Sequence, residues 1–469
     1  MNGSKDTRLE TGGVSRAYEA ARVRHATNEA DASLARREML DRLAEARRQT
    51  DGLFELVRPA ALVDRPIPER HRTLFYIGHL EAFDWNLIGR TVLGLDPVDE
   101  ARERLFAFGI DPVGGNLPDD GVDDWPPLDE VRRFAGVLRA RIDDCLADPQ
   151  FLGRAFSSGS RYLHVAIEHR LMHAETLAYM LHHLPGEKKL APRGAPPTSP
   201  VSPAAPPTPR MVEVPAGTAT LGLDRRAGQF GWDNEFEQHS VAVPAFRIGA
   251  YNITNAEFLR FVLEGGYRER GLWSGEAWSW KEQRGVEHPL FWRRDGGGWL
   301  YRAMFAEIPL PGEWPVYVSH AEASAYARWA GKELPTEAQF HRAAYGTPQG
   351  TERAYSWGDD PPSAGHGNFD FQSWSPAPVG AHPAGNSAWG VADLLGNGWE
   401  WTSTVFGPFP GFERFSFYPG YSADFFDGKH YVQKGGSSRT AACFLRRSFR
   451  NWFQPHYPYT YAGFRLVEN

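Results

Sequence analysis

Residues 185–210 read PGEKKLAPRGAPPTSPVSPAAPPTPR, and this stretch decides how the chain of 469 residues divides. Proline lacks a backbone N–H and stiffens the chain, so a segment this rich in proline predicts an extended, exposed connector. A chain of this length is also too long for one ordinary core. We therefore predict two domains, residues 30–184 and residues 211–469, joined by this linker.

The part before the linker has the pattern of helices. Apolar residues recur at three- and four-residue steps in four stretches, residues 32–55, 70–93, 128–146 and 160–184. Four helices of this length fit a four-helix bundle, in which side chains that face the core can form a metal site.

The part after the linker changes to short strands, many turns and dense Gly, Trp and Tyr. Residues 211–222 and 239–254 alternate in the way of strands. Residues 253–266 and 318–346 predict one helix each, and the remainder from about residue 351 is expected to be mostly loop. This texture predicts a loop-built domain whose aromatic side chains fill the core.

Both predicted helices of this part carry capping residues at their starts. Asn255 is at a suitable position to cap the first helix. Ser319 is followed three residues later by Glu322, which predicts a capping box at the start of the second.

Composition excludes several classes of protein. Apolar residues make up 42% and charged residues 23% of the chain, as in ordinary globular proteins. The net charge is −7 without a long basic run, so we expect no nucleic-acid partner. No apolar run could span a bilayer and the N-terminus lacks an apolar core, which predicts a cytoplasmic protein without a membrane partner. Two cysteines, Cys145 and Cys443, cannot form a disulfide framework.

Histidines on the predicted helices suggest a metal site. The stretch 168–184, EHRLMHAETLAYMLHHL, places His169 and His173 one helical turn apart on one face, the spacing with which a helix gives two ligands to one ion. His79 lies on the second predicted helix with apolar neighbours. Three neutral imidazoles suit Fe(II), and also Zn, Cu or Ni. Solvated or core histidines are the alternative, since such pairs are common by chance.

A series of motifs in the second part carries a family resemblance. In order they are VPAGTATLG (214–222), FEQHSVAVPAFRIGAYNITNAEFLRFV (236–262), PVYVSHAEASAYARWAGKELPTEAQFHRAAYG (315–346), GVADLLGNGWEWT (390–402), KGGSS (434–438) and AGFRL (462–466). They resemble the formylglycine-generating-enzyme (sulfatase-modifying factor) family over nearly all of residues 211–469. This implies a loop-rich, C-type-lectin-like α+β domain. Formylglycine-generating enzymes bind copper through two cysteines of this domain, whereas only Cys443 lies here, which argues against sulfatase maturation.

The combination of the two parts resembles another family. A DinB-like four-helix bundle with one His and then an HxxxH pair, placed ahead of this domain, is similar to the ergothioneine and ovothiol sulfoxide synthases. The resemblance implies that His79, His169 and His173 hold Fe(II), with O2 as co-substrate. It further implies an oxidoreductase that forms a C–S bond, with sulfoxidation, between a thiol and the imidazole of a histidine derivative such as hercynine.

The resemblance also suggests catalytic and substrate-binding residues. In FYPGYSADFF (417–426), Tyr418 is the first choice and Tyr421 the second for a phenol that delivers a proton or an electron near the iron. Asn451 and Trp452 match an Asn–aromatic pair that helps to hold the betaine of hercynine in relatives. Plain loop or strand packing is the alternative for these residues.

Three positions depart from the family pattern. Relatives commonly read HEQQH in the metal helix, whereas this chain reads HRLMH, so Met172 replaces a Gln that contacts the imidazole substrate. Phe453 and Tyr457 stand where relatives that use gamma-glutamylcysteine have Asp and Arg, and the charge-assisted contacts of those residues are lost. We therefore expect cysteine or a sugar-borne thiol or selenol as the donor.

Alternative functions remain open from the sequence. One is a selenoneine synthase that joins hercynine to a selenosugar. Another is an iron-dependent oxidase or hydroxylase of a different substrate, and the third is a non-catalytic ligand-binding protein.

Overall fold

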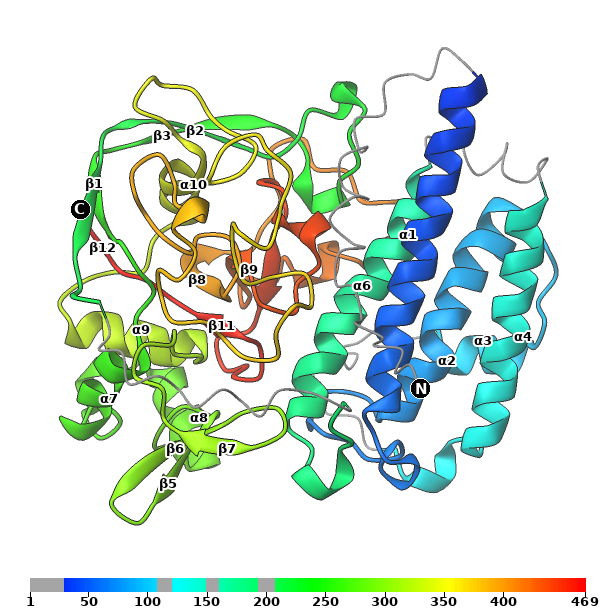
Figure 1. Ribbon diagram of the computed structural model, residues 1–469, viewed down its shortest axis with the longest axis horizontal. Coiled ribbons are helices and arrows are strands. Elements are labelled where there is room, and N and C mark those ends of the chain that lie inside the picture. Colours follow the sequence, from blue (N-terminus) through cyan, green and yellow to red (C-terminus); the bar gives the residue numbers. More distant parts are fainter. Residues whose placement is uncertain (1–28, 108–119, 149–159, 193–206) are drawn as a thin grey trace, which may run out of the picture.

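The computed structural model describes residues 29–107, 120–148, 160–192 and 207–469, which form a helical part and a mixed part side by side (Figure 1). The central residues of the predicted linker, 193–206, lie outside the described residues. The start of the linker is bound to the helical part, because Leu190 N–H donates to the carbonyl oxygen of Leu56 at 2.7 Å.

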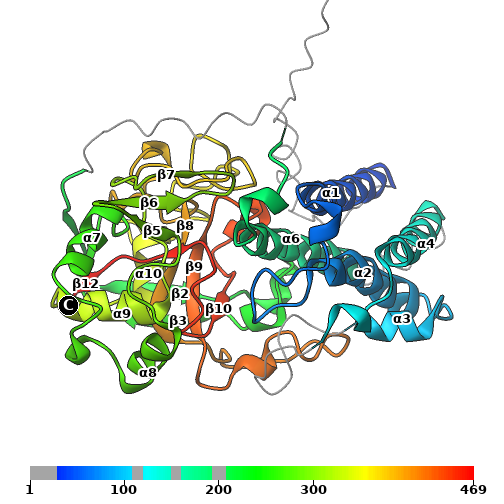
Figure 2. The ribbon, with the colours of Figure 1, turned by 90° about the horizontal axis from the view of Figure 1, so that it is seen from below.

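The helical part is the predicted bundle. Its helices are α1 (Glu29–Glu55), α2 (Thr73–Asp84), the short α3 (Glu100–Leu105), α4 (Leu128–Ala147) and α6 (Arg161–His182). A π-helical segment, Trp85–Val92, continues α2. Helix α6 packs mainly against α1, and α2 packs mainly against α4. Figure 2 shows that α6 is the helix of the bundle that lies against the second domain.

The position of α6 explains its burial. It lies between the rest of the bundle and the second domain, so 18 of its 22 residues are buried, polar ones included. A helix that is covered all round needs partners for every polar side chain, and those partners come from both sides of α6.

The second domain contains four small sheets, and four of their strands lie in the two stretches predicted to form strands, residues 211–222 and 239–254. The first sheet has the order β1 (Met211–Val214), β4 (Phe246–Gly249), β12 (Val467–Glu468), and the second has the order β10 (Asn451–Phe453), β9 (Tyr431–Gly436), β8 (Gly398–Val405), β11 (Ala462–Gly463). The third sheet pairs β2 (Gly217–Leu221) with β3 (His239–Val243). The fourth has the order β5 (Trp292–Asp295), β6 (Gly298–Arg302), β7 (Glu307–Pro309). Strands β8 and β9 are antiparallel, with Trp399 opposite Gly435, so the GNGWEWT and KGGSS motifs lie side by side.

Four helices complete this domain: α7 (Asn255–Leu263), α8 (Gly275–Arg284), α9 (His320–Trp329) and α10 (Glu337–Tyr345). The prediction of one helix over residues 318–346 is wrong, because α9 ends before Gly331, whose φ of 64° lies in the left-handed region. The sequence pattern does not predict α8.

The caps agree with one prediction and correct the other. Ser319 accepts a hydrogen bond from Glu322 N–H, and the Glu322 carboxylate accepts from Ser319 N–H, which confirms the capping box. The cap of α7 is Thr254 rather than Asn255, since the Thr254 hydroxyl accepts from Glu257 N–H. Asn255 is the first helical residue, and its amide donates instead to Pro311 O.

Aromatic side chains fill the core of the second domain, as expected for a loop-built fold. Trp232, Trp292 and Trp401 are each no more than 2% exposed.

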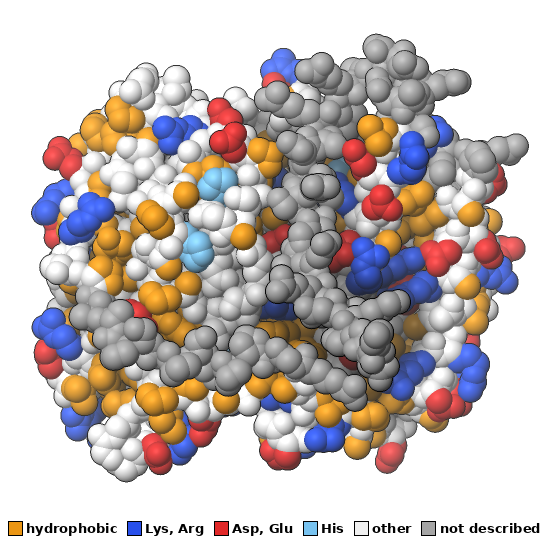
Figure 3. Space-filling view, viewed as in Figure 1, with side chains coloured by type: hydrophobic (Ala, Val, Ile, Leu, Met, Phe, Trp, Pro, Cys, Tyr) orange, Lys and Arg blue, Asp and Glu red, His pale blue; other side chains and the backbone are white. Residues whose placement is uncertain are grey.

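On the face seen in Figure 3, basic and acidic side chains are intermingled over the bundle. Within the part of the chain that the structure describes, no helix is long and apolar enough to cross a membrane.

Candidate metal centre

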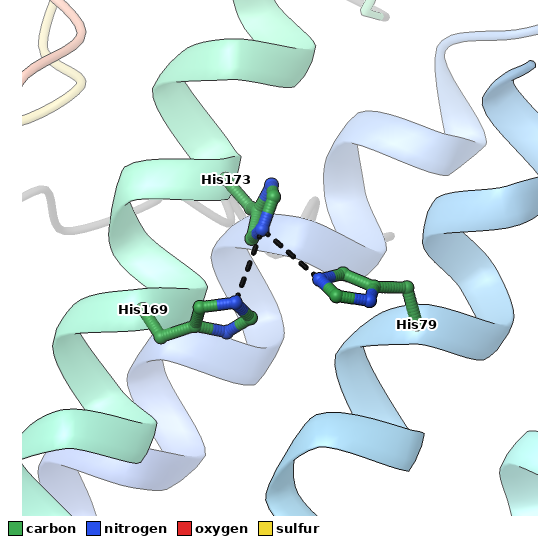
Figure 4. A group of neighbouring side chains, drawn as sticks. All are labelled: His79, His169 and His173. Carbon is green, nitrogen blue, oxygen red and sulfur yellow. Dashed lines mark hydrogen bonds between the residues drawn. The ribbon is translucent and has the colours of Figure 1, made fainter. Parts of the chain in front are cut away.

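Three histidines from two helices of the bundle converge on one point. His79 comes from α2, and His169 and His173 come from adjacent turns of α6 (Figure 4). The Nε2 atom of His173 lies 3.2 Å from Nε2 of His79 and 3.2 Å from Nε2 of His169. One nitrogen from each ring lies within 4.8 Å of the other two, and all three side chains are buried.

Hydrogen bonding and burial set the protonation of these rings. The Nδ1–H of His79 donates to Phe106 O at 2.7 Å, which leaves its Nε2 as a lone pair facing the other rings. Burial lowers the pKa of His79 to about 4, and burial also lowers the pKa of His169 and His173 well below its usual value. The rings are therefore neutral at physiological pH.

Three neutral imidazole nitrogens this close cannot satisfy one another through hydrogen bonds alone. Each neutral ring has one N–H, and that of His79 is already used by Phe106. A divalent cation satisfies converging lone pairs, and an all-imidazole set suits Fe(II) as well as other transition metals. The donor set therefore fits the predicted metal.

Phe83, which the sequence motifs do not single out, packs against the site. Phe83 stacks on His169 with ring centroids 3.5 Å apart and planes 11° apart. It lies one turn after His79 on α2, so its i+4 spacing from a candidate ligand was the signal that could have identified it. On the other side, Tyr76 lies 5.5 Å from the His173 ring.

The predicted phenols reach this centre from the second domain. The rings of Tyr418 and His169 are 6.4 Å apart, and Tyr418 also packs edge-on against Phe83. Tyr421 stacks on Trp232 at 4.0 Å, and burial raises the pKa of its phenol well above the usual range. Tyr418 is therefore the phenol beside the histidines, and Tyr421 belongs to the layer behind it.

Met172 and Trp452 join the same cluster through Tyr421. The Tyr421 hydroxyl donates to Met172 Sδ at 3.5 Å, and the Tyr421 and Trp452 rings are 5.4 Å apart. One face of Trp452 is covered by Phe406, which stacks on it at 4.2 Å. Asn451 is engaged locally, because its side-chain oxygen accepts from Trp452 N–H.

Phe453 and Tyr457 form a second cluster. Their rings stack at 5.0 Å, and a guanidinium from the first domain, that of Arg70, lies 5.2 Å from the Tyr457 ring. Arg70 Nε donates to the Tyr457 hydroxyl at 2.7 Å, and its Nη2 donates to the Tyr179 hydroxyl at 3.0 Å. The sequence gave no signal for Arg70, which precedes α2 in a loop.

Helix α6 presents one stripe of residues to the second domain. Five residues at alternating steps of four and three positions each form a hydrogen bond with a side chain of the second domain: Glu168, Met172, Glu175, Tyr179 and His182. This spacing places them on one face, next to the face that carries His169 and His173. The same helix therefore holds the candidate ligands and docks the second domain.

Two carboxylates of the stripe are the main polar links between the domains. Glu168 accepts two hydrogen bonds from Arg446 at 2.9 Å, and Arg446 also pairs with Glu235. Glu175, two residues after His173 on α6, accepts from Trp399 Nε1 at 2.8 Å. Hydroxyl groups of Ser437 and Thr440 donate to it as well.

Comparisons with known proteins agree with this two-part architecture. Residues 197–469 match the family model described as the sulfatase-modifying factor enzyme 1-like domain, and residues 42–177 match the DinB superfamily. The hercynine oxygenase of Mycolicibacterium thermoresistibile is 39% identical over 345 residues, which cover 72% of this chain and 74% of that protein.

Other relatives match over similar or larger shares of this chain. The hercynine oxygenase of Mycolicibacterium smegmatis is 37% identical over 359 residues, covering 73% of this chain and 78% of that protein. Ergothioneine biosynthesis protein 1 of Neurospora crassa is 28% identical over 503 residues, covering 87% of this chain and 55% of that protein. The matches span both domains, and the chain therefore belongs to the ergothioneine-type sulfoxide synthase family of enzymes.

Proposed function

We propose that this protein is a non-haem iron oxidoreductase that uses O2 to join the imidazole of hercynine to a thiol or selenol donor. The observation that carries the proposal is the convergence of three buried, neutral imidazoles beside a phenol supplied by the other domain. Relatives named hercynine oxygenase support hercynine as the acceptor.

His79, His169 and His173 would hold the iron. Bound Fe(II) would supply the binding of O2 and the redox chemistry that starts from it. The hydrogen bond from His79 to Phe106 and the stacking of Phe83 on His169 would keep the rings oriented toward the metal.

Tyr418 is the candidate for the phenol that gives or takes a proton during the reaction. Its side chain is half-buried. Of the two predicted tyrosines, it is the one whose ring lies beside His169. The neighbouring Tyr421 is tied to Met172 and stacked on Trp232, so its role is to position the cluster.

Trp452 is the candidate for holding the trimethylammonium group of hercynine. The rings of Phe406, Tyr421 and Phe425 lie against Trp452, so the cation would join an aromatic cluster. A quaternary ammonium over an indole face gains about 1–2 kcal/mol when desolvated. Met172 lies where relatives use a Gln, so we expect a contact of the imidazole with a thioether rather than with an amide.

The donor end of the site is expected at Phe453 and Tyr457. Stacked rings, a phenol hydroxyl and the Arg70 guanidinium replace the acid–base pair of relatives that use gamma-glutamylcysteine. Cysteine, or a sugar-borne thiol or selenol, matches this mixture of apolar faces and hydrogen-bonding groups better than a dipeptide that carries two carboxylates and an ammonium group does.

An experiment that tests the function begins with anaerobic loading of the protein with Fe(II). Oxygen uptake is then measured with hercynine and, in turn, cysteine, gamma-glutamylcysteine, a thiosugar or a selenosugar, and products are identified by mass spectrometry. We expect an adduct of hercynine with one donor, absent from His169→Ala. Oxygen uptake without any adduct would instead support an oxidase, and no uptake with any donor would contradict the proposed reaction.

Replacing Tyr418 by phenylalanine removes only the phenolic oxygen of the ring that the second domain places beside His169. We expect normal iron content and a rate of adduct formation lower by about 100-fold or more, since a positioned proton donor is worth roughly 10²–10⁴-fold. The matched control is Tyr421→Phe, which loses the contact with Met172 and should reduce the rate much less. Equal rates in the two variants would remove Tyr418 from the reaction.

A further inference from the structure

Arg170 follows His169 directly in α6, yet its side chain lies on a different face, inside the bundle. The side chain is fully buried. Its Nη2 donates to Asp84 Oδ2 at 2.6 Å and to the backbone oxygen of Leu80 at 3.1 Å. Its Nη1 donates to Glu81 Oε1 at 3.1 Å. All three acceptors belong to α2, within the turns that follow His79.

The contacts of Arg170 belong to a network that includes all four long helices. Arg139 of α4 shares Glu81 with Arg170 and forms a two-pronged ion pair with Asp51 of α1. The hydroxyl of Thr50, also on α1, lies 3.5 Å from Arg170 Nη1. The guanidinium of Arg170 is the member that connects α6 directly to α2.

This connection matters because the two helices that carry the histidines are packed mainly on other helices. Helix α6 lies on α1, and α2 lies on α4, with little direct packing between α2 and α6. The spacing of His79 from the other two rings therefore depends on whatever ties α2 to α6. A planar guanidinium binds two carboxylates and a carbonyl group in one fixed geometry, which a flexible ammonium cannot reproduce.

We propose that Arg170 is a positioning residue of the metal centre. Its guanidinium holds α2 against α6 and thereby sets the distance between Nε2 of His79 and those of His169 and His173. The inference rests on the proposed function in one respect, since it takes these histidines as the metal ligands.

The test is binding of Co(II) to the full-length protein, followed by its visible ligand-field spectrum. We expect Arg170→Lys, which keeps the positive charge but not the fork, to bind Co(II) about 10-fold more weakly. This is the lower end of the roughly 10–100-fold effect of removing a hydrogen-bond partner of a metal ligand, because Arg170 contacts the helix that carries His79 and not a histidine itself. We also expect its Co(II) bands to shift in position and intensity, because the geometry of the three rings changes.

The matched control is Arg465→Lys in the second domain. Arg465 is also fully buried and binds Glu400 with two hydrogen bonds, together with Asn252 and backbone oxygens. Its replacement should lower stability to a similar degree while leaving the affinity for Co(II) and the spectrum unchanged. The comparison separates a general loss of stability from a change at the metal centre.

A milder variant keeps the test decisive if Arg170→Lys does not fold. Asp84→Asn retains an acceptor for Arg170 and leaves Glu81 as the counter-charge, so we expect a smaller loss of Co(II) affinity and a smaller spectral shift. The role of Arg170 would be overturned if Arg170→Lys and Asp84→Asn, where folded, bound Co(II) with the affinity and the visible spectrum of the wild type. The three-histidine site itself would be refuted if the wild type did not bind Co(II), or if His173→Ala bound Co(II) as well as the wild type does.

Discussion

Replacing His173 by alanine is expected to abolish iron binding and product formation while leaving the apoprotein folded. His173 is the central ring, since its Nε2 lies 3.2 Å from the Nε2 atoms of both other histidines. Losing a direct ligand should cost more than the roughly 10–100-fold that loss of an outer partner costs. Iron per chain after anaerobic loading and desalting, together with the rate of adduct formation, measures the effect.

His164→Ala is the control for this variant. His164 lies on the same helix and is also buried, but its ring stacks on Phe230 rather than facing the other histidines. We expect it to retain a full complement of iron, whatever it loses in stability. Normal iron content in His173→Ala would mean that the metal is held elsewhere.

Replacing Arg446 by methionine is expected to produce the largest loss of stability among single changes at the domain interface. Arg446 joins two carboxylates that are almost completely buried, Glu168 of α6 and Glu235 of the second domain. Removal of one member of a buried ion pair costs about 3–5 kcal/mol, because the remaining charge is left without compensation. The midpoint and slope of urea unfolding, followed by fluorescence, measure the effect.

The neighbouring arginine provides the comparison. Arg447 pairs with Glu352 in a partly exposed position, so Arg447→Met should cost about 1 kcal/mol or less. A loss of stability in Arg446→Met no greater than in Arg447→Met would show that the pair with Glu168 does not hold the domains together.

The sequence predicted the bundle well because its helices carry strong periodicity. All four predicted helices exist, and their ends agree within a few residues with α1, α2 with its π-helical continuation, α4 and α6. In the second domain, the helix predicted over residues 253–266 exists as α7, and strands lie in the two stretches predicted to form them. The apolar spacing of residues 318–346 continues across Gly331, where the backbone turns, so the spacing alone predicts one helix where the structure has two.

The candidate site was predictable where its residues share an element or a motif. His169 and His173 are one turn apart on a helix, and Tyr418 lies in a motif of the second domain. The contribution of Arg446 was not predictable, since its partner Glu168 is far away in the chain and only docking of the domains brings them together. The same holds for Glu175, whose partners Trp399 and Thr440 lie in the second domain.

The adjacency of two stripes on α6 has a thermodynamic consequence. A rigid helix that carries two histidines on one face and the docking carboxylates on the next makes metal occupancy and domain association mutually dependent. If association of the second domain orders α6 and so favours metal capture by some factor, occupancy must favour association by the same factor, because the two routes to the loaded, docked state have equal total free energy. Stripping the metal would then loosen an interface in which it takes no part, and weakening that interface would release the metal.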